Sequence, residues 1–177
     1  MREAELSLHR RLGVSQETIL QVQTNLANTY QMLGRVEQAL LMRRYVYAGK
    51  LKICGKEDIS ILTEANNLAH VLINQKHSPS SSLEEAKALL RKTMPVARRV
   101  LGEDDLNTLT MRRNYARALY KDEGATLDDL HEAVTTLEEA IRTARRVFGG
   151  AHPLTTTIWI CLRNSRAVLR ARETPRS

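Results

Sequence analysis

The sequence predicts an all-α protein, a right-handed α-solenoid of antiparallel helix pairs with about eight helices. Three observations predict this class. Alanine, leucine, glutamate and arginine, which favour helices, are abundant among the 177 residues. Eight glycines and four prolines are too few for an all-β domain with many turns. Most importantly, a pattern of glycine, asparagine and alanine recurs along the chain.

The repeat is defined by glycines at intervals of 42, 47 and 47 residues: Gly13, Gly55, Gly102 and Gly149. Twelve residues after each of the first three stands an asparagine: Asn25, Asn67 and Asn114. Sixteen residues before each of the last three stands an alanine: Ala39, Ala86 and Ala133. The five additional residues of the longer copies therefore lie between these anchors. Insertions confined to one loop are typical of stacked helix pairs.

These anchors divide the chain into one repeat domain over residues 1–172 and a flexible tail over 173–177. The repeats cover about 13–54, 55–101 and 102–148, and a terminal helix lies within 149–172. The apolar spacing predicts helices at 2–12, 15–33, 35–53, 57–77, 82–101, 104–122, 128–148 and 152–172. The first of these is expected to be the second member of an incomplete pair. The last is expected to be a first helix without a partner.

Residues at the expected helix ends support these boundaries. Ser82 with Glu85, and Thr126 with Asp129, can each form a capping box at a helix start. Glycine ends each helix that precedes a repeat boundary, with a basic residue three positions earlier that offsets the helix dipole: Arg10, Lys52, Arg99 and Arg146. Pro95 is expected to kink its helix or to interrupt one turn.

The spacing of Leu26-Ala27, Tyr30 and Ala39 is similar to the tetratricopeptide repeat pattern. The string from Phe148 to Thr155, which reads Phe-Gly-Gly-Ala-His-Pro-Leu-Thr, resembles the kinesin light chain type of this repeat, as do the Asn-Leu-Ala triplets. This resemblance covers nearly the whole chain. It implies a scaffold or adaptor that binds other proteins, with the first helices of successive pairs lining a concave groove.

The expected groove residues lie on the first helices, many of them at a spacing of i, i+3 and i+7. They are Asn25, Asn28, Asn67, His70, Asn74, Arg113, Asn114, Arg117, Tyr120 and Lys121. Asparagine can both donate to and accept from a peptide backbone, and the cations of the third copy suit acidic side chains. The resemblance therefore implies an extended, acidic peptide as ligand. Alternatively, Asn25, Asn67 and Asn114 bond neighbouring helices and set the stacking, and both roles can coexist.

The net charge of +7 arises at the C-terminal end, where eight arginines and one acid follow from Arg142 onward. Four arginines define an expected basic surface on the last helix: Arg163, Arg166, Arg170 and Arg172. One interpretation is a solvated face of a terminal helix. The other is that the chain is a structural subunit of a large assembly, possibly with nucleic acid, that docks through this helix. Interleaved aromatic residues are lacking, so base-specific recognition is not expected.

The sequence predicts neither catalysis nor a cofactor. The histidines are scattered, and Cys54 and Cys161 lack ligand-spaced partners, so no metal site is expected. No pairing of a nucleophile with a base can be identified. Isolated cysteines favour free thiols in the cytoplasm or another reducing intracellular compartment. No apolar run approaches 18 residues, so no membrane span is expected. The oligomeric state and the identity of the partner stay open.

Overall fold

The computed structural model describes residues 15–75 and 79–174, which form helices joined by short connections and contain no strand. Seven helices lie in these ranges: α2 (Gln16–Met32), α3 (Val36–Cys54), α4 (Ile59–Ile73), α5 (Ser80–Leu101), α6 (Leu106–Lys121), α7 (Leu127–Phe148) and α8 (Pro153–Glu173). The all-α class is therefore confirmed. Each of the seven corresponds to an expected helix, and α4 is shorter than the expected 57–77. The helix expected at 2–12 lies outside the described residues.

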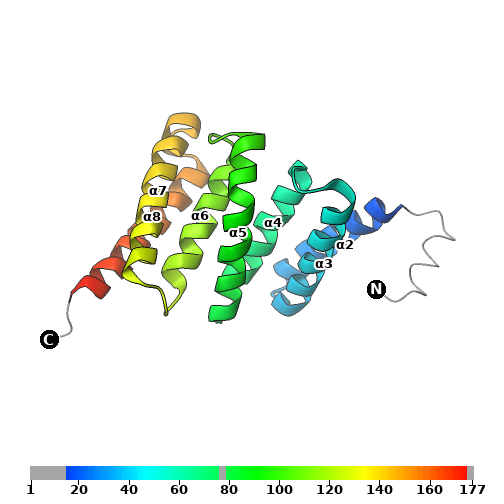
Figure 1. The fold of residues 1–177 in the computed structure, drawn as a ribbon, viewed down its shortest axis with the longest axis horizontal. Coiled ribbons are helices and arrows are strands. Elements are labelled where there is room, and N and C mark those ends of the chain that lie inside the picture. Colours follow the sequence, from blue (N-terminus) through cyan, green and yellow to red (C-terminus); the bar gives the residue numbers. More distant parts are fainter. Residues whose placement is uncertain (1–14, 76–78, 175–177) are drawn as a thin grey trace.

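The helices stand side by side in a row, with α2 at one end of that row and α7 and α8 at the other (Figure 1). Each helix packs against the next along the chain. In addition, α4 contacts α6, and α6 contacts α8. The first helices of successive pairs thus form one layer, and α3, α5 and α7 cover its other side. This is the predicted solenoid of helix pairs, and it brings residues about 47 positions apart into contact.

Glycines end α3, α5 and α7 because the chain must turn there with a positive φ. Gly55, Gly102 and Gly149 have φ values of +81°, +92° and +83°. A residue with a Cβ is strained in this region. The regular glycine spacing in the sequence therefore marks the true end of each second helix.

One expectation about a helix start needs correction, whereas the capping box of Thr126 with Asp129 is confirmed. The box expected at Ser82 does not form. Instead, α5 begins at Ser80 after Pro79, whose extended backbone starts the helix, and Ser82 is buried inside it. Pro95 does not interrupt α5, which continues to Leu101. Pro95 is exposed, so water can satisfy the carbonyl group that its missing N–H leaves free.

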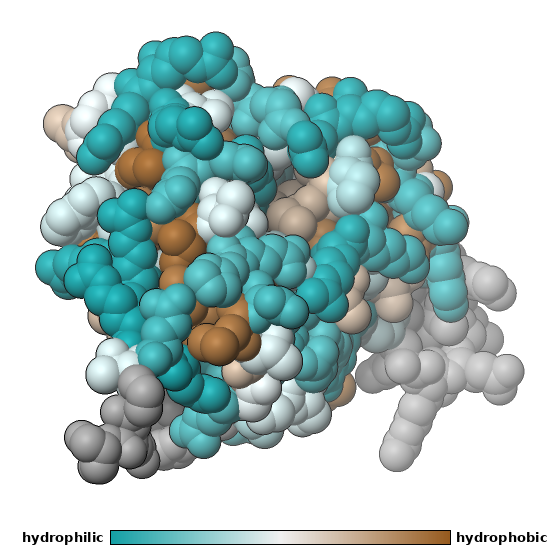
Figure 2. All heavy atoms as spheres, turned by 60° about the vertical axis from the view of Figure 1, so that its left-hand side comes forward, coloured by the Kyte–Doolittle hydropathy of each residue, from teal (hydrophilic) through white to brown (hydrophobic). Residues whose placement is uncertain are grey.

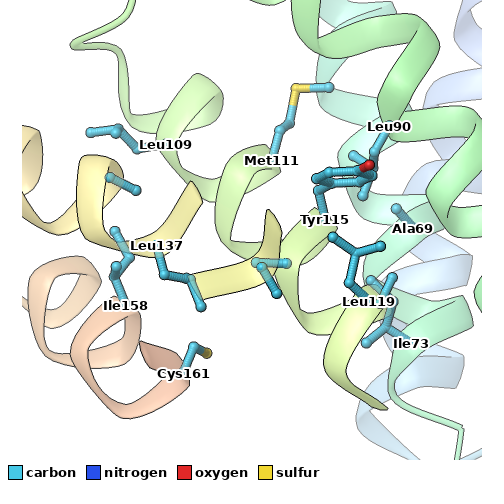
Figure 3. Packing of buried hydrophobic residues seen from close by; sticks show 14 of the residues in the cluster. Ala69, Ile73, Leu90, Leu109, Met111, Tyr115, Leu119, Leu137, Ile158 and Cys161 are labelled. Carbon is cyan, nitrogen blue, oxygen red and sulfur yellow. The ribbon is translucent and has the colours of Figure 1, made fainter. Parts of the chain in front are cut away.

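The core runs continuously from α4 to α8. Around α6, Ala69 and Ile73 of α4, Leu90 of α5 and Tyr115 and Leu119 of α6 gather in one group, and Leu137 meets Ile158 between α7 and α8 (Figure 3). Fully burying one such large apolar side chain contributes about 1.5–3 kcal/mol. Fully buried alanines at the anchor positions keep the helices of each pair close together: Ala39, Ala86 and Ala133.

The basic residues near two helix ends have acidic partners that the sequence did not reveal. Arg99 pairs with Glu57 and Arg146 with Asp104, each at 2.6 Å and across the same separation of 42 residues. Each pair links the end of a second helix to the beginning of the same repeat. All four side chains are more than half exposed, so each pair contributes little stability.

Substitution of Gly149 by alanine tests the role of positive φ. We expect Gly149→Ala to lower the free energy of unfolding by about 1–2 kcal/mol, because alanine resists this conformation. Gly150→Ala is a matched control, since Gly150 lies next to it with open space and no positive φ. The control should change stability by no more than about 0.5 kcal/mol. Urea unfolding followed by circular dichroism measures both, and equal losses would contradict the assignment.

Candidate functional site

A cavity of about 430 Å³ lies where the three first helices α4, α6 and α8 meet. We call it the first-helix cavity. Its lining residues are His70 of α4, Arg113, Arg117, Tyr120 and Lys121 of α6, and Thr157, Ile160, Cys161 and Asn164 of α8. Half of the ten expected groove residues therefore line one cavity, although they are separated by up to 51 positions in the sequence.

A chain of side-chain hydrogen bonds fixes α4 against α6 beside this cavity. Asn107 Nδ2 donates to Thr63 Oγ1 at 2.8 Å, and Asn66 Nδ2 donates to Asn107 Oδ1 at 3.3 Å. Asn114 Nδ2 donates to Asn66 Oδ1 at 2.8 Å. Asn66 and Asn114 are both buried, so each must find hydrogen-bond partners inside the protein. Their pairing therefore sets the register between the two helices.

Arg113 extends this chain to α8. Its Nη2 donates to Asn114 Oδ1 at 3.2 Å, and its Nη1 donates to Thr157 Oγ1 at 3.1 Å. Its Nε is buried and has no hydrogen-bond partner among the described residues. Burial lowers the pKa of Arg113 from its ordinary value. The guanidinium group is thus held at the cavity by neutral acceptors alone.

The expectation that Asn114 lies in the groove needs correction. Its side chain is completely buried and cannot contact a peptide, so the alternative role, in which the repeated asparagine bonds a neighbouring helix, applies to it. Sequence reasoning missed Asn66 and Asn107. The available signal was that Asn66 and Arg113 occupy equivalent positions, 47 residues apart, immediately before the repeated asparagines. Each of them bonds to the next first helix.

Three cations lie along one face of α6, at Arg113, Arg117 and Lys121. Arg117 Nη2 donates to Asn74 Oδ1 at 2.6 Å, and Lys121 Nζ donates to the Ile73 carbonyl at 3.0 Å. In the described ranges, none of the three forms a salt bridge with a carboxylate. Burial lowers the pKa of Lys121. The cavity therefore carries positive charge that has only neutral hydrogen-bond partners.

Two uncharged groups of the cavity, His70 and Tyr120, have shifted pKa values, and burial is the largest cause of both shifts. Burial, followed by repulsion from Arg117, Arg113, Arg43 and Lys121, lowers the pKa of His70 to about 4. Burial raises the pKa of Tyr120 to about 12. At neutral pH His70 is therefore uncharged and Tyr120 stays protonated. Both can form hydrogen bonds with a ligand without adding charge.

The remaining expected groove residues do not line the cavity. Asn25 and Asn28 are exposed on α2, and Asn67 is half-buried on α4. Asn28 accepts a hydrogen bond from Arg43, which also pairs with the buried Glu64 at 3.2 Å. Asn74 is exposed beside the cavity, where it binds Arg117.

The expected basic surface on α8 is partly paired within the chain. Arg166 forms a salt bridge with Glu138 of α7 at 2.7 Å, and Arg172 donates to the Glu123 carbonyl. The guanidinium of Arg163 lies 5.3 Å from the centre of the Trp159 ring. Arg170 is exposed on the same stripe. These four arginines lie outside the first-helix cavity.

Comparison with known proteins identifies the repeats. Residues 65–106 and 125–154 match the tetratricopeptide repeat model, which is the repeat that the sequence resembles. None of the curated proteins matches the sequence significantly.

The fold is that of solved kinesin light chain-like repeat proteins, which confirms the predicted subtype at the level of fold. A single-substitution variant of such a protein from Podosopora anserina, with nearly identical repeats, is 21% identical, with a TM-score of 0.72. The similarity covers 97% of this chain and 76% of that one. BtubC (BKLC) from P. vanneervenii is 15% identical over 93% of this chain and 70% of its own, with a TM-score of 0.64.

Several chemical features are absent from the described ranges. No group of three or more histidine, cysteine or acidic side chains there could hold a metal ion. No helix in those ranges has the length and apolar character to cross a membrane. Cys54 is exposed and Cys161 is buried, and both are free thiols.

Removal of the Asn114 side chain tests the hydrogen-bond chain. We expect Asn114→Ala to lower the free energy of unfolding by about 1–3 kcal/mol, because it leaves buried groups of Asn66 and Arg113 without a partner. Asn67→Ala is the control, since Asn67 is half-buried and no side-chain hydrogen bond is found for it in the described structure. It should change stability by about 0.5 kcal/mol or less. Chemical denaturation measures both variants, and similar losses would show that the chain does not stabilise the array.

The lowered pKa of His70 predicts a loss of stability in acid. Between the ordinary pKa of 6.5 and the folded value of about 4, the unfolded chain binds a proton that the folded chain does not. Stability should therefore fall as pH drops through this window. His70→Gln should remove this contribution, leaving a shallower dependence of the unfolding free energy on pH. Identical pH profiles for the two proteins would contradict the assignment.

Proposed function

We propose that the chain is a non-enzymatic scaffold that binds an extended, acidic segment of a partner protein in the first-helix cavity. Tetratricopeptide repeats generally mediate protein–protein interactions, and two segments of this chain match that repeat. One observation carries the more specific proposal. Arg113, Arg117 and Lys121 converge on a single cavity without a carboxylate partner in the described parts of the chain.

The spacing of these cations suits an extended ligand. They stand four residues apart on α6, which separates neighbouring cations by about 6 Å along the helix. In an extended peptide, side chains two residues apart are separated by about 6.6 Å and point the same way. A segment with acidic residues at alternate positions, lying along α6, can therefore present one carboxylate to each cation.

Arg117 and Lys121 would gain stronger hydrogen bonds by exchanging their present partners for the carboxylates of such a ligand. Arg117 and Lys121 now donate to the neutral oxygens of Asn74 and Ile73. A carboxylate forms a charge-assisted hydrogen bond that is roughly twice as strong as a neutral one. His70 and Asn164, which also line the cavity, can bond the ligand backbone. The partial burial of Arg113 and Arg117 makes their contacts less sensitive to salt than contacts on an open surface.

Neutral substitutions in the cavity test the proposal. We expect Arg117→Gln combined with Lys121→Gln to weaken binding of a fluorescein-labelled peptide with alternating glutamates by about tenfold or more, because two charged contacts are lost. Arg142→Gln is the matched control, since Arg142 is exposed on α7 and, among the described residues, donates a hydrogen bond only to the Glu138 carbonyl of its own helix. Fluorescence polarisation measures the affinities. No binding by the unmodified chain, or equal binding by both variants, would reject the proposal.

A further inference from the structure

The repeat register identifies a face of α8 that differs from its equivalents. Three positions on each of the first helices α4 and α6 are completely buried and apolar: Leu62, Ala69 and Leu72 on α4, and Leu109, Ala116 and Leu119 on α6. The equivalent positions on α8, 47 residues further on, are exposed and polar: Thr156, Arg163 and Arg166. A second helix follows each of these first helices and packs against it: α5 packs against α4, and α7 packs against α6. No helix follows α8 within the described residues.

This face, which we call the α8 outer face, combines an aromatic ring with arginines. Trp159 is 45% exposed, and the guanidinium of Arg163 lies over its ring. Arg170 follows seven residues after Arg163, which places both on one side of the helix. In the described residues neither has a salt bridge, whereas Arg166 is held by Glu138. In Figure 2, which brings the α7–α8 end of the row forward, hydrophilic residues cover most of the surface and apolar patches lie between them.

We infer that the α8 outer face docks an acidic amphipathic helix of a partner protein, in the position that α5 and α7 take on α4 and α6. The array supplies the precedent for this position, because the equivalent faces of α4 and α6 each contact the helix that follows. Arg163 and Arg170 supply the positive charge that selects an acidic helix. An apolar helix in this position would bury the charge of Arg163 without a partner, which is costly. A helix that carries carboxylates there pairs with Arg163 and Arg170.

Trp159 provides the apolar contact of this interface. Tryptophan and arginine are the residues most often found at the energetic centre of protein interfaces. A platform for single-stranded nucleic acid instead uses several aromatic side chains on which successive bases stack. The α8 outer face has Trp159 alone, so the observations favour a protein helix. The inference is independent of the peptide site, because the first-helix cavity uses Thr157, Cys161 and Asn164 on another side of α8.

The intrinsic fluorescence of the chain reports on this face directly, because Trp159 is the sole tryptophan. The probe is a synthetic amphipathic helix with a leucine stripe flanked by glutamates. Its binding should shift the tryptophan emission to shorter wavelength in a saturable manner. Arg163→Glu with Arg170→Glu should weaken this binding by about tenfold or more. Arg166 is left unchanged because it pairs with Glu138. If the charge-reversed variant with glutamates fails to fold, the neutral variant with Arg163→Gln and Arg170→Gln replaces it.

Three controls separate this docking site from its alternatives. Arg117→Gln, in the first-helix cavity, should leave the emission shift and the affinity unchanged. A peptide of the same composition in scrambled order, which forms no amphipathic helix, should bind at least about tenfold more weakly. A single-stranded oligouridylate should not compete with the helix. Equal binding of the scrambled peptide, displacement by the oligouridylate, an unchanged emission or undiminished binding by both arginine variants would each overturn the inference.

Discussion

The direct contact between successive first helices is the constraint on which the rest of the structure depends. Buried polar side chains set this contact: Asn114 bonds Asn66 across the α4–α6 interface, and Arg113 continues the chain to Thr157 of α8. Because buried polar groups must be satisfied, the helices can adopt few other registers. In this register His70 of α4 and the cations of α6 face the same cavity. The buried polar groups therefore fix how the first helices pack, and this packing forms the first-helix cavity.

Most of the fold follows from local rules that the sequence displays. Gly102 and Gly149 end helices because a positive φ excludes side chains, and Thr126 starts one because its hydroxyl caps free N–H groups. The sequence left two roles open for Asn114, since repetition does not show whether a side chain faces the groove or the neighbouring helix. The cations of α6 could be predicted from their spacing. That they lack carboxylate partners in the described ranges could not be predicted, because it depends on how helices far apart in the sequence pack together.

The two cationic surfaces of the chain differ in physical character. In the first-helix cavity Arg113 and Arg117 are partly buried, and burial lowers the pKa of Arg113 and Lys121. On the α8 outer face the arginines are exposed to solvent, where salt at physiological concentration screens charges beyond about 8 Å. Binding in the cavity should accordingly tolerate salt better than docking on α8. Net charge alone would not distinguish these surfaces, because both are positive.

A crystal structure of the chain with a bound acidic peptide tests the central claim most directly. The account predicts an extended peptide along α6, with carboxylate oxygens within about 3 Å of Arg117 and Lys121. It also predicts that Asn114 keeps its hydrogen bond to Asn66, because that bond supports the site rather than contacting the ligand. A peptide bound on the side formed by α5 and α7, or one that leaves the cations of α6 with their present neutral partners, would contradict the account.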